Sequence, residues 1–169
     1  RIANAAQSKP ANKYLAWVRF AVPGMLAQGN IDAMEYAIAN MPADKPVVEI
    51  GSFCGLSTVV LSYFLEKRSK TGALYTCDQW EFEGQRKGEP LGDSPSVTHD
   101  AYQAYVRSTF LHVMRTFAAN RLPYTIECVS DEFFRRWFNN ETTVDVFGRR
   151  AVLGGEIGFC YIDGNHKYE

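Results

Sequence analysis

The chain has 169 residues, a formal net charge of −1 and a hydrophobic fraction of 46%. This length supports one domain with a substantial core, and the composition is typical of globular rather than disordered proteins. The balanced, scattered charge argues against a nucleic-acid partner, and no apolar run is long enough for a membrane span.

The cysteine pattern and the two ends of the sequence guide the expected location of the protein. Residues 1–9 lack the apolar core of a signal peptide. No C-x-x-C pair occurs, so a zinc site is not expected, and we predict buried, reduced thiols in a cytoplasmic protein. The chain begins without Met and ends at Glu169, so we expect it to be part of something longer. The four cysteines are Cys54, Cys77, Cys128 and Cys160.

Residues 1–45 form a predicted N-terminal helical segment. A first helix is expected over residues 12–21, ending before Pro23. A second is expected to begin at Asn30, as its capping residue, and to run to about Met41. Two interpretations remain open: the segment packs on the main domain, or it forms a lid or a dimer element.

Residues 46–169 alternate between predicted strands and helices. This order is typical of an α/β, Rossmann-like parallel sheet with helices on both faces, here apparently truncated after its fourth strand. A long polar loop, residues 79–98, is of the kind that often carries function. Residues 139–158 are ambiguous, and two segments, 143–147 and 151–153, could pair as a hairpin around Gly148. We predict strands at 47–50, 73–77, 124–129 and 159–162, and helices at 56–68, at 100–120 and after a cap at Ser130–Asp131.

A glycine-rich turn follows the first predicted strand. Gly51 and Gly55 allow backbone conformations and close approaches that a Cβ would block. Ser57 falls where the next helix offers free N–H groups, so the junction is suited to cradling a nucleotide-like ligand. Glu49 is unusual, because a carboxylate on an otherwise apolar strand is costly to bury unless something pairs with it.

Polar residues cluster where each predicted strand ends. Ligands of open parallel sheets bind at this edge, and an acidic residue such as Asp78, after the second strand, can accept hydrogen bonds from a ribose diol. The wide spacing from Gly51 to Gly55 lacks the tight corner of dinucleotide-binding enzymes. A ligand with a ribose and an amino-acid-like tail fits better, because Glu49 can face an ammonium group. The clusters are Gly51 to Gly55, Asp78, Ser130–Asp131 and Asp163 to His166.

These motifs resemble class I S-adenosylmethionine-dependent methyltransferases. The residues that carry the resemblance are Glu49-x-Gly51-x-x-x-Gly55-x-Ser57, then Asp78, then Ile162-Asp163-Gly164-x-His166-x-Tyr168-Glu169. The closing stretch is similar to the small-molecule O-methyltransferase subgroup that includes macrocin methyltransferases and cephalosporin-hydroxylase-like proteins. The resemblance implies methyl transfer from S-adenosylmethionine to an oxygen of a small molecule.

The resemblance also implies the roles of individual residues. The glycine turn would hold the methionine part of the cofactor, Asp78 would bind the ribose hydroxyls, and Gln79 or Trp80 would lie near the adenine. Asp163 and His166 are the expected catalytic residues. The full cofactor-binding set is Glu49, Gly51, Ser52, Gly55, Ser57, Asp78, Gln79, Trp80, Ser130 and Asp163.

Metal dependence and the catalytic base are left open by the sequence. Some relatives use the aspartate that matches Asp163 as a Mg²⁺ ligand, together with an acidic pair that would lie beyond Glu169. One aspartate does not make a magnesium site. His166 is the candidate general base, because an imidazole titrates at a pH of about 6.5; alternatively it orients Asp163.

Three further expectations concern partners and alternative functions. A sheet that ends at its fourth strand exposes an edge, so we expect self-association, most simply as a homo-oligomer. The first alternative function is an NAD-dependent oxidoreductase. The second is a non-catalytic methyltransferase-like binding module.

Overall fold

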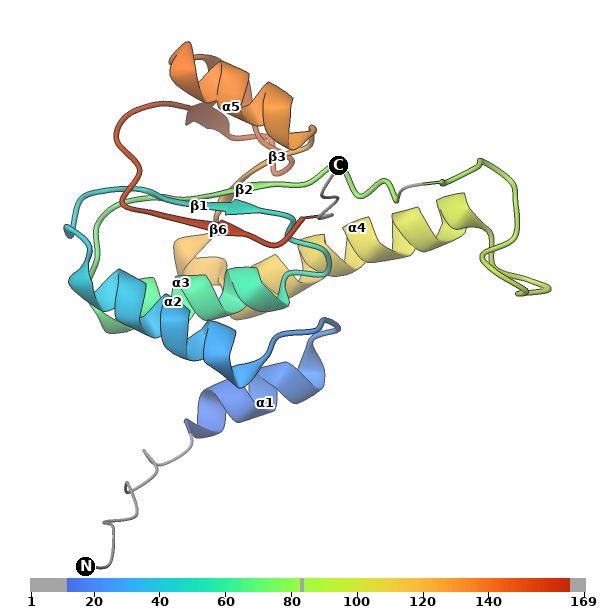
Figure 1. Ribbon diagram of the computed structural model, residues 1–169, viewed down its shortest axis with the longest axis horizontal. Coiled ribbons are helices and arrows are strands. Elements are labelled where there is room, and N and C mark those ends of the chain that lie inside the picture. Colours follow the sequence, from blue (N-terminus) through green and yellow to red (C-terminus); the bar gives the residue numbers. More distant parts are fainter. Residues whose placement is uncertain (1–11, 83, 165–169) are drawn as a thin grey trace, which may run out of the picture.

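A computed structural model of the chain describes residues 12–82 and 84–164 (Figure 1). Four parallel strands form one sheet in the order β3-β2-β1-β6, and two antiparallel strands form a separate hairpin, β4-β5. The strands are β1 (Val47–Ile50), β2 (Leu74–Cys77), β3 (Tyr124–Ile126), β4 (Thr142–Val144), β5 (Arg150–Val152) and β6 (Phe159–Ile162). The helices are α1 (Lys13–Ala21), α2 (Gln28–Asn40), α3 (Leu56–Lys67), α4 (His99–Phe117) and α5 (Ser130–Phe138).

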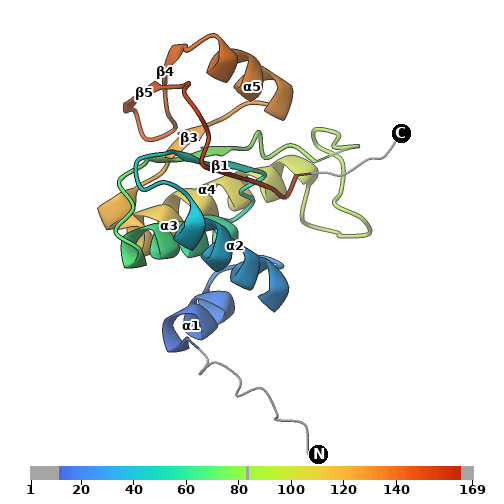
Figure 2. The same cartoon turned by 60° about the vertical axis from the view of Figure 1, so that its left-hand side comes forward.

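The helices cover both faces of the sheet, which confirms the predicted Rossmann-like α/β fold. Helices α1 to α4 lie on one side of the sheet and α5 on the other (Figure 1). The β4-β5 hairpin lies on the α5 side (Figure 2). Strand β1 is central, and its Val48 pairs in register with Tyr75 of β2 and Cys160 of β6. All three pairings in the sheet are parallel, as the alternation of strands and helices predicts.

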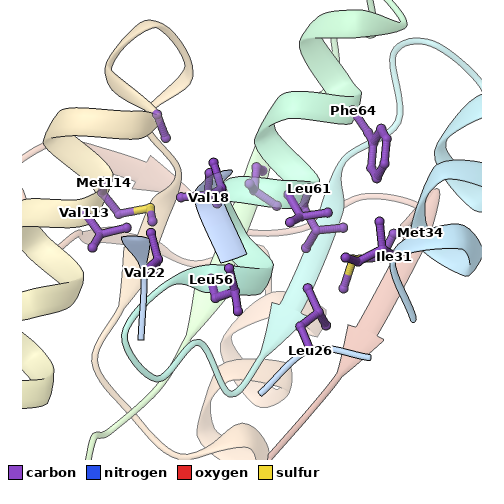
Figure 3. Packing of buried hydrophobic residues seen from close by; sticks show 14 of the residues in the cluster. Val18, Val22, Leu26, Ile31, Met34, Leu56, Leu61, Phe64, Val113 and Met114 are labelled. Atoms are coloured by element: carbon purple, nitrogen blue, oxygen red, sulfur yellow. The ribbon is translucent and has the colours of Figure 1, made fainter. Parts of the chain in front are cut away.

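The larger core joins the N-terminal helices to the sheet. Val18 of α1 and Met34 of α2 are fully buried against α3, whose Leu61 and Phe64 lie in the same cluster (Figure 3). Burying an aliphatic side chain of this size contributes about 1.5–3 kcal/mol. Helices α1 and α2 are therefore held on the sheet domain by apolar packing. A second, smaller core lies under α5, around Phe133 and Trp137.

Several predicted elements are confirmed, with shifted ends. The loop at residues 79–98 contains only an isolated bridge, between Pro90 and Thr98, apart from residue 83, which is not described. The ambiguous segment does form a hairpin, β4-β5, and Gly148 adopts a φ of 79° in its turn. Strand β3 ends at Ile126, three residues earlier than expected, and α4 ends at Phe117, shortly before a 3-10 turn at Ala119–Arg121.

Two predicted helix caps are wrong. Helix α2 begins at Gln28, because the carbonyl of Ala27 already accepts the N–H groups of Asn30 and Ile31. Asn30 therefore lies inside the first turn. Helix α5 similarly begins at Ser130 itself, with Val129 as the preceding residue, so Ser130 is the first helical residue and not a cap. In both cases backbone geometry, rather than a side-chain oxygen, sets the start.

Two further expectations concern the edge of the sheet and membrane-spanning helices. Within the part of the chain that the structure describes, β6 is an edge strand, and self-association through it stays a prediction. Across the same residues, none of the helices combines the length and apolar character that crossing a membrane requires.

Candidate functional site

The glycine turn after β1 depends on both of its glycines. Gly51 adopts a φ of 84°, and a Cβ there would lie 2.6 Å from the carbonyl oxygen of Asp163. Gly55 adopts a φ of 95°, and a Cβ there would lie 2.6 Å from the Met114 Cε atom. L-residues avoid this left-handed region, so both positions favour glycine for their conformation. At Gly51 the close neighbour is backbone and cannot move aside, whereas at Gly55 it is the flexible end of the Met114 side chain. The turn therefore packs between the end of β6 and helix α4.

Asp78 holds the same turn from the end of β2. Its Oδ2 atom accepts hydrogen bonds from the backbone N–H groups of Ser52 and Phe53, both at 2.8 Å. Its Oδ1 atom accepts the N–H of Trp80 at 2.7 Å. Burial raises the pKa of Asp78, although these hydrogen bonds oppose that effect. The aspartate predicted to bind ribose hydroxyls is therefore also the residue that shapes the glycine turn.

Trp80 supports the turn from the protein interior. Its side chain is 1% exposed and packs against Phe110, with ring centroids 5.3 Å apart. Its indole Nε1–H donates to the carbonyl oxygen of Phe53 at 2.9 Å. Trp80 does not line the cavity described below, whereas its neighbour Gln79 does. The structure thus places Gln79, not Trp80, where a ligand in the cavity would meet it.

Glu49 lies beneath the turn, fully buried. Its Oε2 atom accepts a hydrogen bond from the Thr58 hydroxyl at 2.5 Å, and its Oε1 atom has no partner among the described residues. Burial raises the pKa of Glu49 to about 7, from an ordinary value of 4.5, although the Ser57 and Thr58 hydroxyls oppose this effect. The nearby Ser52 hydroxyl is likewise buried without a described partner. Of these two buried groups, Ser52 lines the smaller cavity described below, whereas Glu49 lines neither cavity.

A cavity of about 740 Å³ lies at the carboxyl ends of three strands. The turn after β1 contributes Gly51, the end of β2 contributes Asp78, and the end of β6 contributes Asp163. As far as the described residues line it, the charged side chains are all acidic. The complete described lining is Gly51, Phe53, Asp78, Gln79, Glu81, Phe82, Asp163 and Gly164.

A second, smaller cavity of about 50 Å³ adjoins the first and shares Gly51, Phe53 and Asp163 with it. Its other wall is the segment from Pro23 to Leu26, between α1 and α2. Ser52 and Ser57 of the glycine turn also face it. The N-terminal helices therefore do more than cover the sheet, because their connection closes one end of the site.

Asp163 belongs to a chain of polar contacts that reaches α2. The Tyr161 hydroxyl donates to Asp163 Oδ2 at 3.2 Å, and the Asn30 side-chain amide donates to the Tyr161 oxygen at 3.3 Å. Burial raises the pKa of Tyr161 to about 12, and the neighbouring Asp163 carboxylate adds to this effect. His166, the predicted base, lies outside the described residues.

The remaining predicted site residues fall in different places. Ser130 is exposed at the start of α5 and does not line either cavity, so its predicted role in cofactor binding receives no support from the cavity geometry. Asp163 was also predicted as a possible metal ligand. Within residues 12–82 and 84–164, no group of three or more His, Cys, Asp or Glu side chains is arranged to hold a metal ion.

Sequence reasoning missed several residues that shape the site. Phe53 and Phe82 form apolar walls of the cavity, and Glu81 adds a third carboxylate. The connection beginning at Pro23 was interpreted only as a helix stop, and Tyr161 only as a strand residue. The positive φ of Phe53, 46°, has no sequence signal, because it follows from the fixed positions of its neighbours.

Comparisons with known proteins address the family directly. No match was found among curated proteins. A crystal structure of a Klebsiella pneumoniae protein that has been proposed to be an O-methyltransferase is similar, with a TM-score of 0.46 and 14% identity. That likeness covers 80% of this chain and 51% of the other, so the chain spans about half the length of that protein. The sequence profile of a methyltransferase domain family matches residues 48–169, from β1 through the end of the chain. This match includes the glycine turn, Asp78 and Asp163, and the chain therefore belongs to the methyltransferase domain family.

Proposed function

We propose that the chain binds S-adenosylmethionine in the 740 Å³ cavity and transfers its methyl group to an oxygen of a small molecule. One observation carries the proposal: Gly51, Asp78 and Asp163, from the ends of three parallel strands, line one cavity. Open parallel sheets bind ligands at this edge. Membership of the methyltransferase domain family supports the same ligand.

The charge of the cavity favours this cofactor over a dinucleotide. S-adenosylmethionine carries a positively charged sulfonium and an ammonium group, which are attracted to a lining that includes Asp78, Glu81 and Asp163. NAD would bring two negatively charged phosphates to the same three carboxylates. The oxidoreductase alternative is therefore disfavoured by electrostatics as well as by the wide spacing of Gly51 and Gly55.

The residues present fit the cofactor in specific ways. Asp78 uses its oxygens for three backbone N–H groups, but a carboxylate accepts about four hydrogen bonds, so capacity remains for a ribose hydroxyl. The Ser52 hydroxyl lines the smaller cavity and suits the polar amino-acid tail, and the Glu49 carboxyl lies buried beneath the same turn. Phe53 and Phe82 supply apolar walls for the adenine.

The cofactor would supply an electrophilic methyl group, and the chain must orient the acceptor and remove its proton. Asp163 is exposed, lines both cavities and is the described carboxylate best placed to hold an acceptor hydroxyl. His166 follows it by three positions and is the proposed base. No step through a metal ion is proposed, because Asp163 belongs to no group of three or more potential ligands within the described segments.

Calorimetry tests the cofactor assignment. The full chain is titrated with S-adenosylmethionine, S-adenosylhomocysteine and NAD. Asp78→Ala should weaken binding of the first two by at least about tenfold, which corresponds to the loss of one charge-assisted hydrogen bond. Asp131→Ala removes an exposed carboxylate on α5, outside the cavity lining, and should bind as the wild type does.

The outcomes separate the alternatives. Binding of NAD but not of S-adenosylhomocysteine would favour the oxidoreductase. Because Asp78 also holds the glycine turn, thermal unfolding of each variant must accompany the titration, and Asp78→Asn provides a less disruptive second variant. Cofactor binding without methyl transfer to any oxygen acceptor would indicate a non-catalytic module. Wild-type protein that binds none of the three ligands would overturn the proposal.

A further inference from the structure

Two cysteines meet where β2 and β3 end, on the side of the sheet that faces α5. Cys77 is the last residue of β2 and pairs in register with Ile126, and Cys128 lies two positions beyond Ile126. Cys128 lies at the bend that follows the strand, and this bend places its thiol beside that of Cys77. Their sulfur atoms lie 3.8 Å apart, and the Cys77 thiol also donates to the Cys128 carbonyl oxygen at 3.2 Å.

The two thiols differ in access and in charge. Cys77 is 1% exposed, whereas Cys128 is partly exposed. Contact with the Cys77 thiol lowers the pKa of Cys128, and the nearby Arg136 cation adds to this effect, whereas partial burial and the Glu132 carboxylate oppose it. The pKa of Cys77 is raised by the same contact and by burial. Cys128 is thus the more acidic and accessible thiol, and Cys77 is held beside it as a partner.

We propose that Cys77 and Cys128 form an oxidation site that a peroxide converts into an intramolecular disulfide. The Cys128 thiolate attacks the peroxide O–O bond, giving a sulfenic acid and releasing an alcohol, or water from hydrogen peroxide. The Cys77 sulfur then attacks the Cys128 sulfur, the S–O bond breaks, and water leaves with the Cys77 proton. The two thiols lose two electrons in total, and the peroxide gains them.

The bridge would form one residue from Asp78. A disulfide requires a sulfur–sulfur distance of about 2.05 Å, against 3.8 Å here, so rotation of the two side chains and adjustment of the strand ends beside Asp78 must close the gap. Asp78 holds the Ser52 and Phe53 N–H groups at 2.8 Å, and such bonds weaken quickly when an oxygen moves. We therefore expect oxidation to weaken cofactor binding by about tenfold, an effect that rests on the proposed function.

Peptide mapping tests the site itself. The full chain is treated with hydrogen peroxide, remaining thiols are blocked with iodoacetamide, and a non-reduced digest is analysed by mass spectrometry. The expected product is a peptide pair joined through Cys77 and Cys128. Cys160→Ser should keep this product, and Cys128→Ser should abolish it. Cys77→Ser should leave a Cys128 sulfenic acid that dimedone captures.

The outcomes decide both parts of the proposal. Full alkylation of Cys77 and Cys128 after peroxide treatment, or a bridge that involves Cys54 or Cys160, would overturn the oxidation site. Circular dichroism of Cys128→Ser, whose side chain is the more exposed of the pair, checks that a lost bridge does not reflect unfolding. Calorimetry of oxidised and reduced wild type tests the coupling to the cofactor. Equal affinities would refute the coupling alone, and absence of binding to reduced protein would refute the proposed function instead.

Discussion

Replacing Gly51 with alanine tests whether the glycine turn is set by a close approach between backbone segments. At a φ of 84° the alanine must adopt a left-handed conformation. Its Cβ would also lie 2.6 Å from the Asp163 carbonyl oxygen and 2.7 Å from the Gly164 nitrogen, where an ordinary contact begins at 3.4 Å. Both neighbours are backbone atoms, so neither can rotate away. The segment after β6 must therefore shift.

The two penalties can be estimated separately. Left-handed backbone costs an L-residue about 1–2 kcal/mol. Forcing an extra carbon into a packed site costs about 1–3 kcal/mol more. The expected loss is therefore about 2–5 kcal/mol of unfolding free energy, a large part of the 5–15 kcal/mol that is typical of a domain.

Gly148→Ala provides the matched control. Gly148 has a φ of 79°, nearly that of Gly51, but a Cβ there would meet nothing within 4 Å. An alanine at position 148 would therefore adopt the left-handed conformation without overlapping any neighbouring atom. Urea unfolding followed by circular dichroism should show Gly51→Ala to be less stable than Gly148→Ala by about 1–3 kcal/mol. Equal losses in the two variants would show that the approach of Asp163 to the turn does not constrain position 51.

Three other substitutions probe buried polar groups, two beside the site and one in the β4-β5 hairpin. The pKa of Glu49 is raised from 4.5 to about 7, so the protonated carboxyl stabilises the folded protein at low pH, and this stability is lost as the pH rises through 7. The unfolding free energy of Glu49→Gln, measured in urea relative to wild type, should therefore increase by about 3 kcal/mol between pH 4.5 and pH 8. A difference between the two proteins that does not change with pH would refute this. Trp80→Phe removes the 2.9 Å bond to the Phe53 carbonyl and should lower the unfolding free energy by about 1–3 kcal/mol, whereas an unchanged melting temperature would contradict that role. Asp145→Ala removes the buried carboxylate that pairs with Arg149 in the turn of the β4-β5 hairpin, and should cost about 3 kcal/mol of unfolding free energy. A loss below about 1 kcal/mol would show that the pair is effectively solvated.

The alternation of strands and helices was sufficient to predict the parallel sheet, because its signals are local. The β-branched run before Gly51 and the short interval to β2 each depend on a few neighbouring residues. The ends of elements were harder, since they depend on which backbone groups find partners. Asn30 has the chemistry of a cap, yet the Ala27 carbonyl starts α2 earlier. Nothing near Asn30 in the sequence reveals this competition.

Site residues could be predicted only where the local backbone or the end of a strand requires one particular residue type. Asp78 and Gly51 were found because a parallel sheet brings strand ends together. The interior position of Trp80 was not foreseen, because an aromatic residue after Asp78 suits an adenine as well as it suits a core. Its φ of 52° and its bond to Phe53 arise from contacts across 27 positions of sequence. Such long-range constraints leave no local pattern.

The buried carboxylates connect the stability of the fold to the proposed ligand. Burial raises the pKa of both Glu49 and Asp78, so ionising either one destabilises the folded protein. Ionisation still costs free energy because hydrogen bonds from the surrounding N–H and hydroxyl donors offset the effect of burial only in part, and Glu49 Oε1 has no described partner. A cationic ligand in the adjoining cavity would favour the ionised forms and recover part of that cost as binding energy. Glu49→Gln should accordingly stabilise the free protein at neutral pH and weaken its affinity for the cofactor. The substitution removes the buried negative charge that destabilises the free protein, and with it the attraction of that charge to a cationic ligand.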